Sequence, residues 1–98
     1  MLTITAVIKV KDGYTEVMSN ALKEVTLHVE EHEPATIGFF VSQDLANPCV
    51  FTTYERFVDQ DAMDTHNNSP VVARFFDIAK PILDGEVLLV KAREVTIK

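Results

Sequence analysis

The sequence predicts an α+β fold with the element order βαββαβ. Four segments alternate apolar and polar residues with the two-residue period of a strand, or carry the short apolar runs of one. Two other regions place apolar residues three and four positions apart, as amphipathic helices do. Asp-Gly pairs and prolines separate these segments. The 98 residues fit a single domain, residues 1–98.

The first predicted strand covers residues 2–11. A helix over 14–31 follows, and Thr15 or Asp12 is its expected N-terminal cap. The helix is expected to end near residue 33, because the residue before a proline avoids the helical region.

Two further strands are predicted over 36–43 and 49–58. The turn between them, 44–48, is short, so the pair is expected to form a hairpin. One face of the first of these strands is expected to carry Ile37, Phe39 and Val41.

The second helical region opens at the acidic segment 59–61, which suits the positive end of a helix dipole. It is interrupted before Pro70, which fits the first turn of a continuing helix, and it ends near Pro81. A last strand is expected over 86–97. In this order the elements predict a ferredoxin-like sandwich with an antiparallel sheet and both helices on one face.

Composition argues against several classes of function. Nine Lys and Arg against fifteen Asp and Glu give a net charge of −6, which disfavours binding to nucleic acid or anionic lipid. No apolar run approaches the roughly 18 residues of a membrane span, and the first residues lack a signal-peptide pattern. A single cysteine, Cys49, excludes an internal disulfide and a thiolate zinc cage. We therefore expect a cytoplasmic protein with neither a nucleic-acid nor a membrane partner.

Apolar residues point toward both faces of the predicted sheet. Residues 87–90 form a continuous apolar run, and 39–40 and 50–51 are adjacent apolar pairs. Two helices can cover only one face, and the other would leave a large apolar patch in water. A second copy packed through a two-fold axis would cover it, so we expect a homodimer. The alternative is that these residues are only strand formers at the centre of a sheet.

His66 is the main candidate for chemistry. It lies at helical spacing from Ala62 and Met63, so it is predicted to point toward the sheet. A neutral imidazole can accept a proton near pH 7, because its reference pKa is about 6.5. The alternative is a histidine at a helix end that bonds a carbonyl and has no catalytic role.

Glu55 is the second candidate, in the middle of the third predicted strand. An unpaired charge there is costly, so Glu55 is expected to be paired or functional. The structural alternative is an ion pair with Arg74 or Arg93. Its neighbour Tyr54 points to the opposite face, and the sequence leaves open which face lines a pocket.

No metal and no organic cofactor are predicted. His28 and His32 have the H-x-x-E-H spacing of inverted zinc peptidases, but the third ligand is lacking and the glutamates suit a solvated helix end. No glycine-rich phosphate loop is present either.

Residues 53–70 resemble the core signature of the antibiotic biosynthesis monooxygenase family. In that signature a strand Glu and an aromatic residue are followed by a helical Ala-Leu-x-x-His and by Ser-Pro. Residues 33–37 look like the family's Glu-Pro-Gly-Thr-Leu, with Ala35 in place of Gly, and residues 44–48 like its Asp-x-x-Asn-Pro hairpin. The resemblance spans nearly the whole chain. The absence of Trp counts against the family's haem-degrading branch.

This resemblance implies a dimeric α+β barrel with a pocket between helices and sheet. It also implies a cofactor-independent monooxygenase that acts with molecular oxygen on a small aromatic substrate, such as a quinol, an anthrone or a polyketide. His66 and Glu55 are the expected catalytic residues, with His66 as general base. The expected substrate-binding residues are Tyr54, Phe57, Met63, Phe39, Phe75, Phe76 and Arg74.

Two alternatives remain at this point. One is a non-oxidative isomerase or lyase that uses the same pocket. The other is a dimer that binds a small ligand without changing it. The donor to a developing oxyanion is also open among Tyr14, Tyr54 and Arg74.

Overall fold

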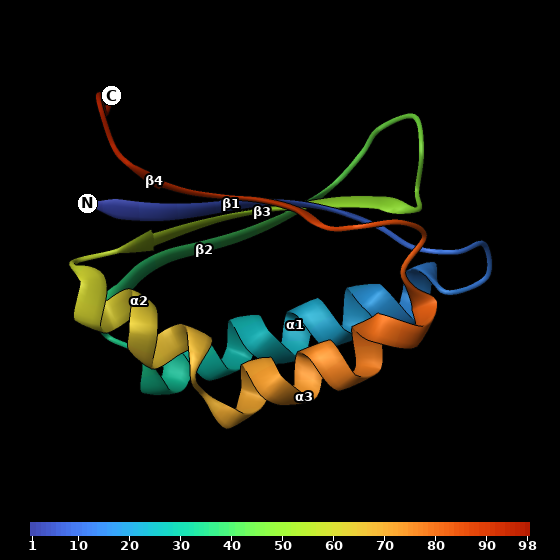
Figure 1. The fold of residues 1–98 in the computed structure, drawn as a ribbon, viewed down its shortest axis with the longest axis horizontal. Helices are drawn as coiled ribbons and strands as arrows, with labels where there is room; N and C mark the ends of the chain where they lie inside the picture. Colours follow the sequence, from blue (N-terminus) through green and yellow to red (C-terminus); the bar gives the residue numbers. More distant parts are fainter.

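The computed structural model describes residues 1–98, and its strands form one sheet with the helices on one side (Figure 1). The elements follow in the order β1 (Leu2–Lys9), α1 (Thr15–His32), β2 (Thr36–Gln43), β3 (Val50–Phe57), α2 (Gln60–Asn67), α3 (Pro70–Ala79), the short 3₁₀ helix η1 (Lys80–Ile82) and β4 (Leu88–Arg93). The strand order is β2-β3-β1-β4, and all neighbours are antiparallel. The predicted ferredoxin-like sandwich is therefore confirmed.

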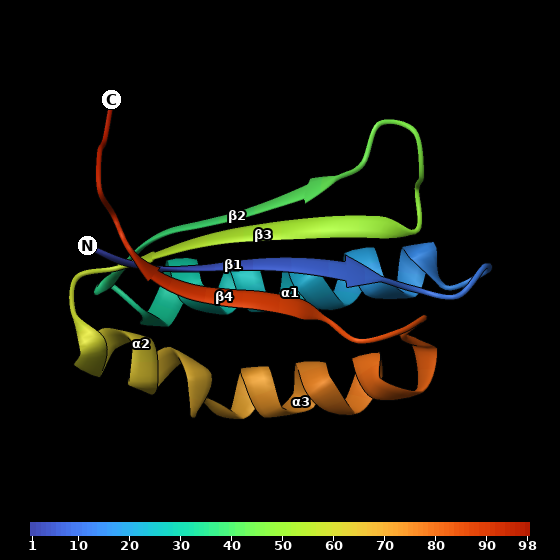
Figure 2. The same cartoon turned by 45° about the horizontal axis from the view of Figure 1, so that its top comes forward.

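Helices α1 and α3 lie side by side beneath the sheet, and α2 continues the line of α3 at one end (Figure 2). Side-chain caps explain where α2 and α3 begin. Asp59 accepts a hydrogen bond from the Ala62 backbone N–H at 2.9 Å, and Ser69 accepts one from the Val72 N–H at 3.4 Å. Pro70 then fills the first position of α3, where its missing N–H costs nothing.

Helix α1 begins without a side-chain cap, so the expectation of a cap at Thr15 or Asp12 is wrong. Tyr14 occupies the cap position instead. Thr15 and Asp12 both contact the Cys49 thiol, at 3.7 and 3.5 Å. These contacts draw both side chains toward the β2–β3 hairpin.

Two strand predictions need correction. The last strand covers only Leu88–Arg93 of the predicted 86–97, because its pairing with β1 runs from Leu88 opposite Val7 to Arg93 opposite Leu2. In β2 the register shifts between Thr36 and Gly38, so Ile37 is turned outward and is 46% exposed. Simple alternation predicts that Ile37 shares a face with Phe39 and Val41. In the structure Ile37 points outward instead.

The core lies between the sheet and the helices. Its most deeply buried large side chains are Phe57, Met18 and Val10. The opposite face of the sheet is uncovered (Figure 1). The strand pairing places Phe40, Tyr54, Leu88 and Val90 on this face, and all four are exposed. None of the helices is both long and apolar enough to cross a membrane.

Candidate functional site

A cavity of about 190 Å³ lies between the sheet and the helices. Eleven of its fifteen lining residues are hydrophobic, and they include the expected Phe39, Phe75 and Phe76. Its polar lining consists of Thr53, Glu55, His66 and Asn67. A mainly apolar hollow with a few convergent polar groups is typical of a site for a small molecule.

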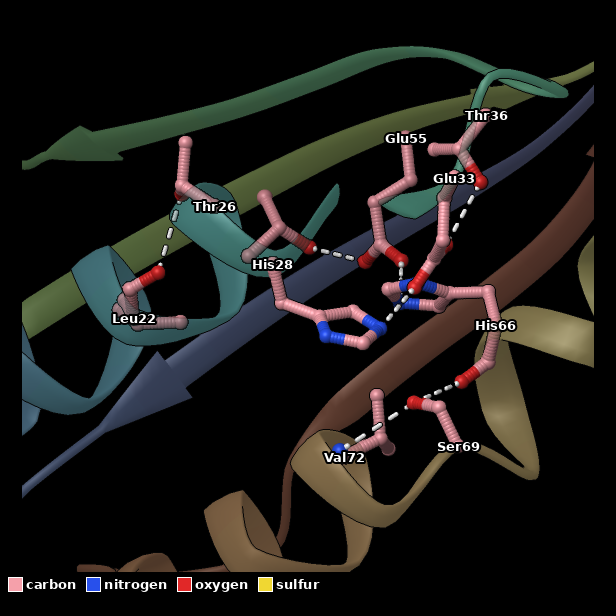
Figure 3. A network of polar contacts seen from close by, with 10 residues as sticks. Leu22, Thr26, His28, Glu33, Thr36, Glu55, His66, Ser69 and Val72 are labelled. Atoms are coloured by element: carbon pink, nitrogen blue, oxygen red, sulfur yellow. Dashed lines mark hydrogen bonds and ion pairs between the residues drawn. The ribbon is translucent and has the colours of Figure 1, made fainter. Parts of the chain in front are cut away.

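His66 is fixed in this cavity from several directions. It lies in the last turn of α2 and is buried, with 3% of its surface exposed. The rings of Phe39 and Phe57 pack against it, with centroids 5.6 and 5.4 Å from its own. The Ser69 hydroxyl donates a 2.7 Å hydrogen bond to the His66 carbonyl, which holds the junction of α2 and α3 (Figure 3). The imidazole thus points toward the sheet, as predicted from its spacing.

The two ring nitrogens of His66 face two different carboxylates (Figure 3). Nδ1 lies 2.8 Å from Oε1 of Glu33, and Nε2 lies 3.2 Å from Oε1 of Glu55. The Thr53 hydroxyl donates to the other oxygen of Glu55 at 2.8 Å. Glu55 is therefore paired with His66, and neither Arg74 nor Arg93 is its partner.

Burial alone would lower the pKa of His66, but Glu55 and Glu33 outweigh that effect. Their hydrogen bonds and negative charges raise the pKa above the ordinary 6.5. The ring is therefore protonated over a wider pH range than a free histidine. Once deprotonated, it is a stronger proton acceptor than an ordinary imidazole.

Glu33 is a member of this site that the sequence interpretation missed. Its position before Pro34 indicated only the end of a helix. In the structure it is the buried C-terminal cap residue of α1, and its side chain turns inward to His66. The available signal was its place in residues 33–37, the segment that resembles the family's motif.

Four of the expected substrate-binding residues lie outside the cavity. Tyr54 is on the uncovered face of the sheet, where its ring stacks with Phe40 at 6.5 Å. Phe57 and Met63 are buried in the hydrophobic cluster behind His66. Arg74 is exposed on α3 and pairs with Glu24, at 2.7 Å. The inner face of β3 therefore presents Glu55 to the cavity.

The two remaining histidines lie on one face of α1, with ring centroids 5.1 Å apart. Nε2 of His28 is 3.2 Å from Oε2 of Glu33, and Nε2 of His32 is 3.6 Å from Oε2 of Glu31. His28 therefore belongs to the outer end of the buried network, and His32 belongs to the surface.

Comparison with known proteins identifies the relatives of this chain. The sequence model that describes the antibiotic biosynthesis monooxygenase family matches residues 1–78. No functionally curated protein matches the sequence. Among solved structures, an antibiotic biosynthesis monooxygenase superposes with a TM-score of 0.87 and 19% identity, over 98% of this chain and 100% of its own.

Two further structures show the same fold. A Nitrosomonas europaea protein, whose name assigns it provisionally to that family, has a TM-score of 0.89 and 18% identity, over 98% of this chain and 100% of its own. A conserved protein from Methanosarcina mazei has a TM-score of 0.84 and 25% identity, over 95% of this chain and 91% of its own.

Proposed function

We propose that this chain, which belongs to the antibiotic biosynthesis monooxygenase family, is a cofactor-independent monooxygenase of small aromatic substrates. The observation that carries the proposal is the Glu55–His66 pair at the wall of an apolar cavity lined by Phe39, Phe75 and Phe76. Such a cavity suits a flat aromatic ring. The Glu55–His66 pair beside the cavity can accept a proton from an aromatic substrate bound there.

The size of the cavity narrows the substrate class. At about 190 Å³ it is smaller than the roughly 300 Å³ at which pockets for drug-sized ligands begin. Quinols of one or two fused rings therefore suit it better than three-ring anthrones. Phe76 and Leu89 line the cavity and are also 42% and 46% exposed, so they lie at its mouth.

In the proposed reaction the substrate itself reduces oxygen. Its O–H or acidic C–H bond breaks, and the proton passes to the Glu55–His66 pair. The electron-rich anion then donates electrons to O₂ and forms a carbon–oxygen bond. The pair returns the proton to the resulting peroxide, and loss of water, with the remaining hydrogen of that carbon, leaves a new carbonyl on the ring. One oxygen atom thus enters the product and the other leaves as water. The apolar walls exclude water while the anion exists.

A homodimer is part of the proposal. It is supported by the uncovered face of the sheet, on which Phe40, Tyr54, Leu88 and Val90 are exposed side chains. A second sheet packed there would remove this patch from water.

A cytoplasmic location is also part of the proposal. The single free cysteine, Cys49, is consistent with it.

The test is oxygen uptake by the purified protein with naphthoquinols and anthrones in the presence of a chelator. The wild type is expected to consume oxygen, and His66→Ala to lose most of that activity. Arg74→Ala is the matched control, because Arg74 lies outside the cavity, and it should retain activity. A wild type that consumes no oxygen across the panel would refute the oxygenase. Turnover under nitrogen would indicate an isomerase or lyase, and binding without turnover a ligand-binding protein.

A further inference from the structure

Glu33 is a buried carboxylate with no direct part in the proposed reaction. It is 8% exposed and does not line the cavity. Its Oε1 receives the Thr36 hydroxyl at 2.8 Å and lies 2.8 Å from Nδ1 of His66. Its Oε2 is buried and makes no hydrogen bond, although Nε2 of His28 lies 3.2 Å away. A buried carboxylate costs stability unless it is paired and hydrogen-bonded, and one oxygen of Glu33 is not hydrogen-bonded.

We propose that Glu33 is a positioning residue that holds His66 in the Nδ1–H tautomer and so leaves Nε2 to exchange the proton at the cavity. This inference rests on the proposed function, because it assigns a role within the same reaction. Glu33 acts on the substrate only through the imidazole.

The hydrogen-bond donors around Glu33 fix the direction of the Nδ1 contact. The Thr36 hydroxyl already donates to Oε1, so this oxygen is an acceptor. The Nδ1 contact, at 2.8 Å, is a hydrogen bond, whereas Nε2 lies farther from its carboxylate oxygen, at 3.2 Å, so Nδ1 is the nitrogen that carries the hydrogen. When the ring is neutral it has only this one N–H, so Nε2 keeps a free lone pair. That lone pair lies on the side of Glu55, which lines the cavity.

The charges around the ring favour uptake of a proton at this lone pair. With a neutral ring, no positive charge lies between the carboxylates of Glu33 and Glu55. Transfer of a substrate proton into the gap between Glu55 Oε1 and Nε2 forms an imidazolium between the two carboxylates. The substrate bond to hydrogen breaks, Nδ1 keeps its own proton, and the ring gains one positive charge. Glu33 therefore both orients the ring and increases its proton affinity.

The titratable groups that face His66 and its network come from β3 and from α1. Glu55 approaches from β3 and Glu33 from the end of α1. His28, also on α1, approaches the free oxygen of Glu33, and its side chain is 27% exposed. His28 thus connects the buried network to the protein surface.

The first test uses the free protein and needs no turnover. Nuclear magnetic resonance of histidine labelled with ¹³C and ¹⁵N reports the tautomer and the pKa of each ring. The wild type is expected to show neutral His66 as the Nδ1–H tautomer. Glu33→Gln should lower the pKa of His66 toward 6.5 and populate the Nε2–H tautomer, because a glutamine carries no charge and can donate as well as accept. Glu33→Asp retains the charge and should keep the pKa closer to the wild-type value.

Thr36→Val is the matched control, because it removes the other bond to Oε1 and leaves the carboxylate in place. It should preserve the tautomer of His66. A wild-type His66 that is neutral as the Nε2–H tautomer would overturn the inference, even if no Glu33 variant folds. Glu33→Gln with an unchanged tautomer and pKa would overturn it as well.

The second test follows kcat/KM for oxygen uptake against pH. The acid limb of the wild-type profile should follow the pKa of His66, since the deprotonated ring is the acceptor. In Glu33→Gln this limb should move to lower pH by the shift measured by magnetic resonance, with a maximum rate at least tenfold lower. A loss of rate that is equal at every pH would indicate a merely structural role and contradict the proposal. If the wild type has no oxygenase activity, the proposed function fails, and the magnetic resonance test still decides the tautomer.

Discussion

Removal of the His66 imidazole would leave the side chains of Glu33 and Glu55 buried without a cation between them. Deleting one partner of a buried ion pair typically costs about 3–5 kcal/mol, because the remaining charge is uncompensated. We therefore expect His66→Ala to lower the free energy of unfolding by about this amount at pH 7, measured by urea denaturation.

Arg74→Ala provides the control for this stability measurement. The Arg74–Glu24 pair is largely exposed, at 66% and 46% of the two side chains, so its loss should cost less than about 1 kcal/mol. Equal losses in the two variants would show that the buried network contributes little to stability.

The raised pKa of His66 also predicts how stability depends on pH. A histidine whose pKa is higher in the folded state binds a proton more tightly there than in the unfolded chain. The resulting stabilisation is fully present below the unfolded pKa of about 6.5 and is lost as the pH rises through the folded value. In the wild type the contribution of His66 to the free energy of unfolding should therefore decline above pH 6.5.

Urea denaturation across pH 5–9, in wild type and in His66→Gln, isolates that contribution as the difference between the two curves. The difference should shrink as the pH rises. A difference that grows with pH would contradict the assignment of His66 as a group with a raised pKa.

At the residue scale, the sequence identified His66 and Glu55 but did not reveal that they pair with each other. Helical spacing shows which way a side chain points, and it predicted the inward direction of His66. The partners depend on contacts between segments distant in sequence, and Glu33 is 33 residues from His66. The same limit explains why the expected role of Arg74 at the site is wrong. Its partner, Glu24 on α1, is distant in sequence and could not be predicted.

At the scale of elements, the junction of α2 and α3 determines where His66 lies. Ser69 caps α3 with its hydroxyl and also donates to the His66 carbonyl. Ser69→Ala should therefore cost about 1–2 kcal/mol in the free energy of unfolding, in the upper part of the usual range for a helix cap. It should also lower the oxygen uptake, because the imidazole loses a constraint on its position.

Asp59→Ala is the matched cap variant, since Asp59 caps α2 at the end remote from His66. It should cost about 1 kcal/mol of stability and leave the oxygen uptake close to that of the wild type. Equal effects of the two substitutions on activity would argue against a positioning role for the junction.

Most elements could be predicted because each has a local signal. Alternation indicated β1, β2 and β3, and the spacing of apolar residues indicated α1 and α3. The outward turn of Ile37 could not be predicted, because it arises from a register shift against β3 that leaves no mark in the spacing of β2. The bounds of β4 likewise follow from its pairing with β1, which the apolar pattern of residues 86–97 does not indicate.

At the scale of the whole molecule, the uncovered sheet face predicts self-association. Val90 and Leu88 are 48% and 64% exposed on this face, so a charged side chain there would be buried at a dimer interface. We expect the wild type to sediment as a dimer and Val90→Asp to sediment mainly as a monomer.

Leu45→Asp is the control for this experiment, because Leu45 is fully exposed in the β2–β3 connection. It should leave the dimer intact. A wild type that sediments as an 11.0 kDa species at all concentrations would refute the dimer.

The alternation of side chains along β3 depends on the loop that joins β2 to β3. Adjacent residues place a carboxylate, Glu55, in the cavity and a phenol, Tyr54, on the other face. A slip of one position along β2 and β1 would exchange the two and remove the acid from the imidazole. The loop that sets this alignment is braced by Asp44, which accepts from two backbone N–H groups, and by Asn47, which accepts from that of Cys49. The length of a solvent-exposed loop is thus as much a requirement of the proposed chemistry as the identity of the groups assigned to it.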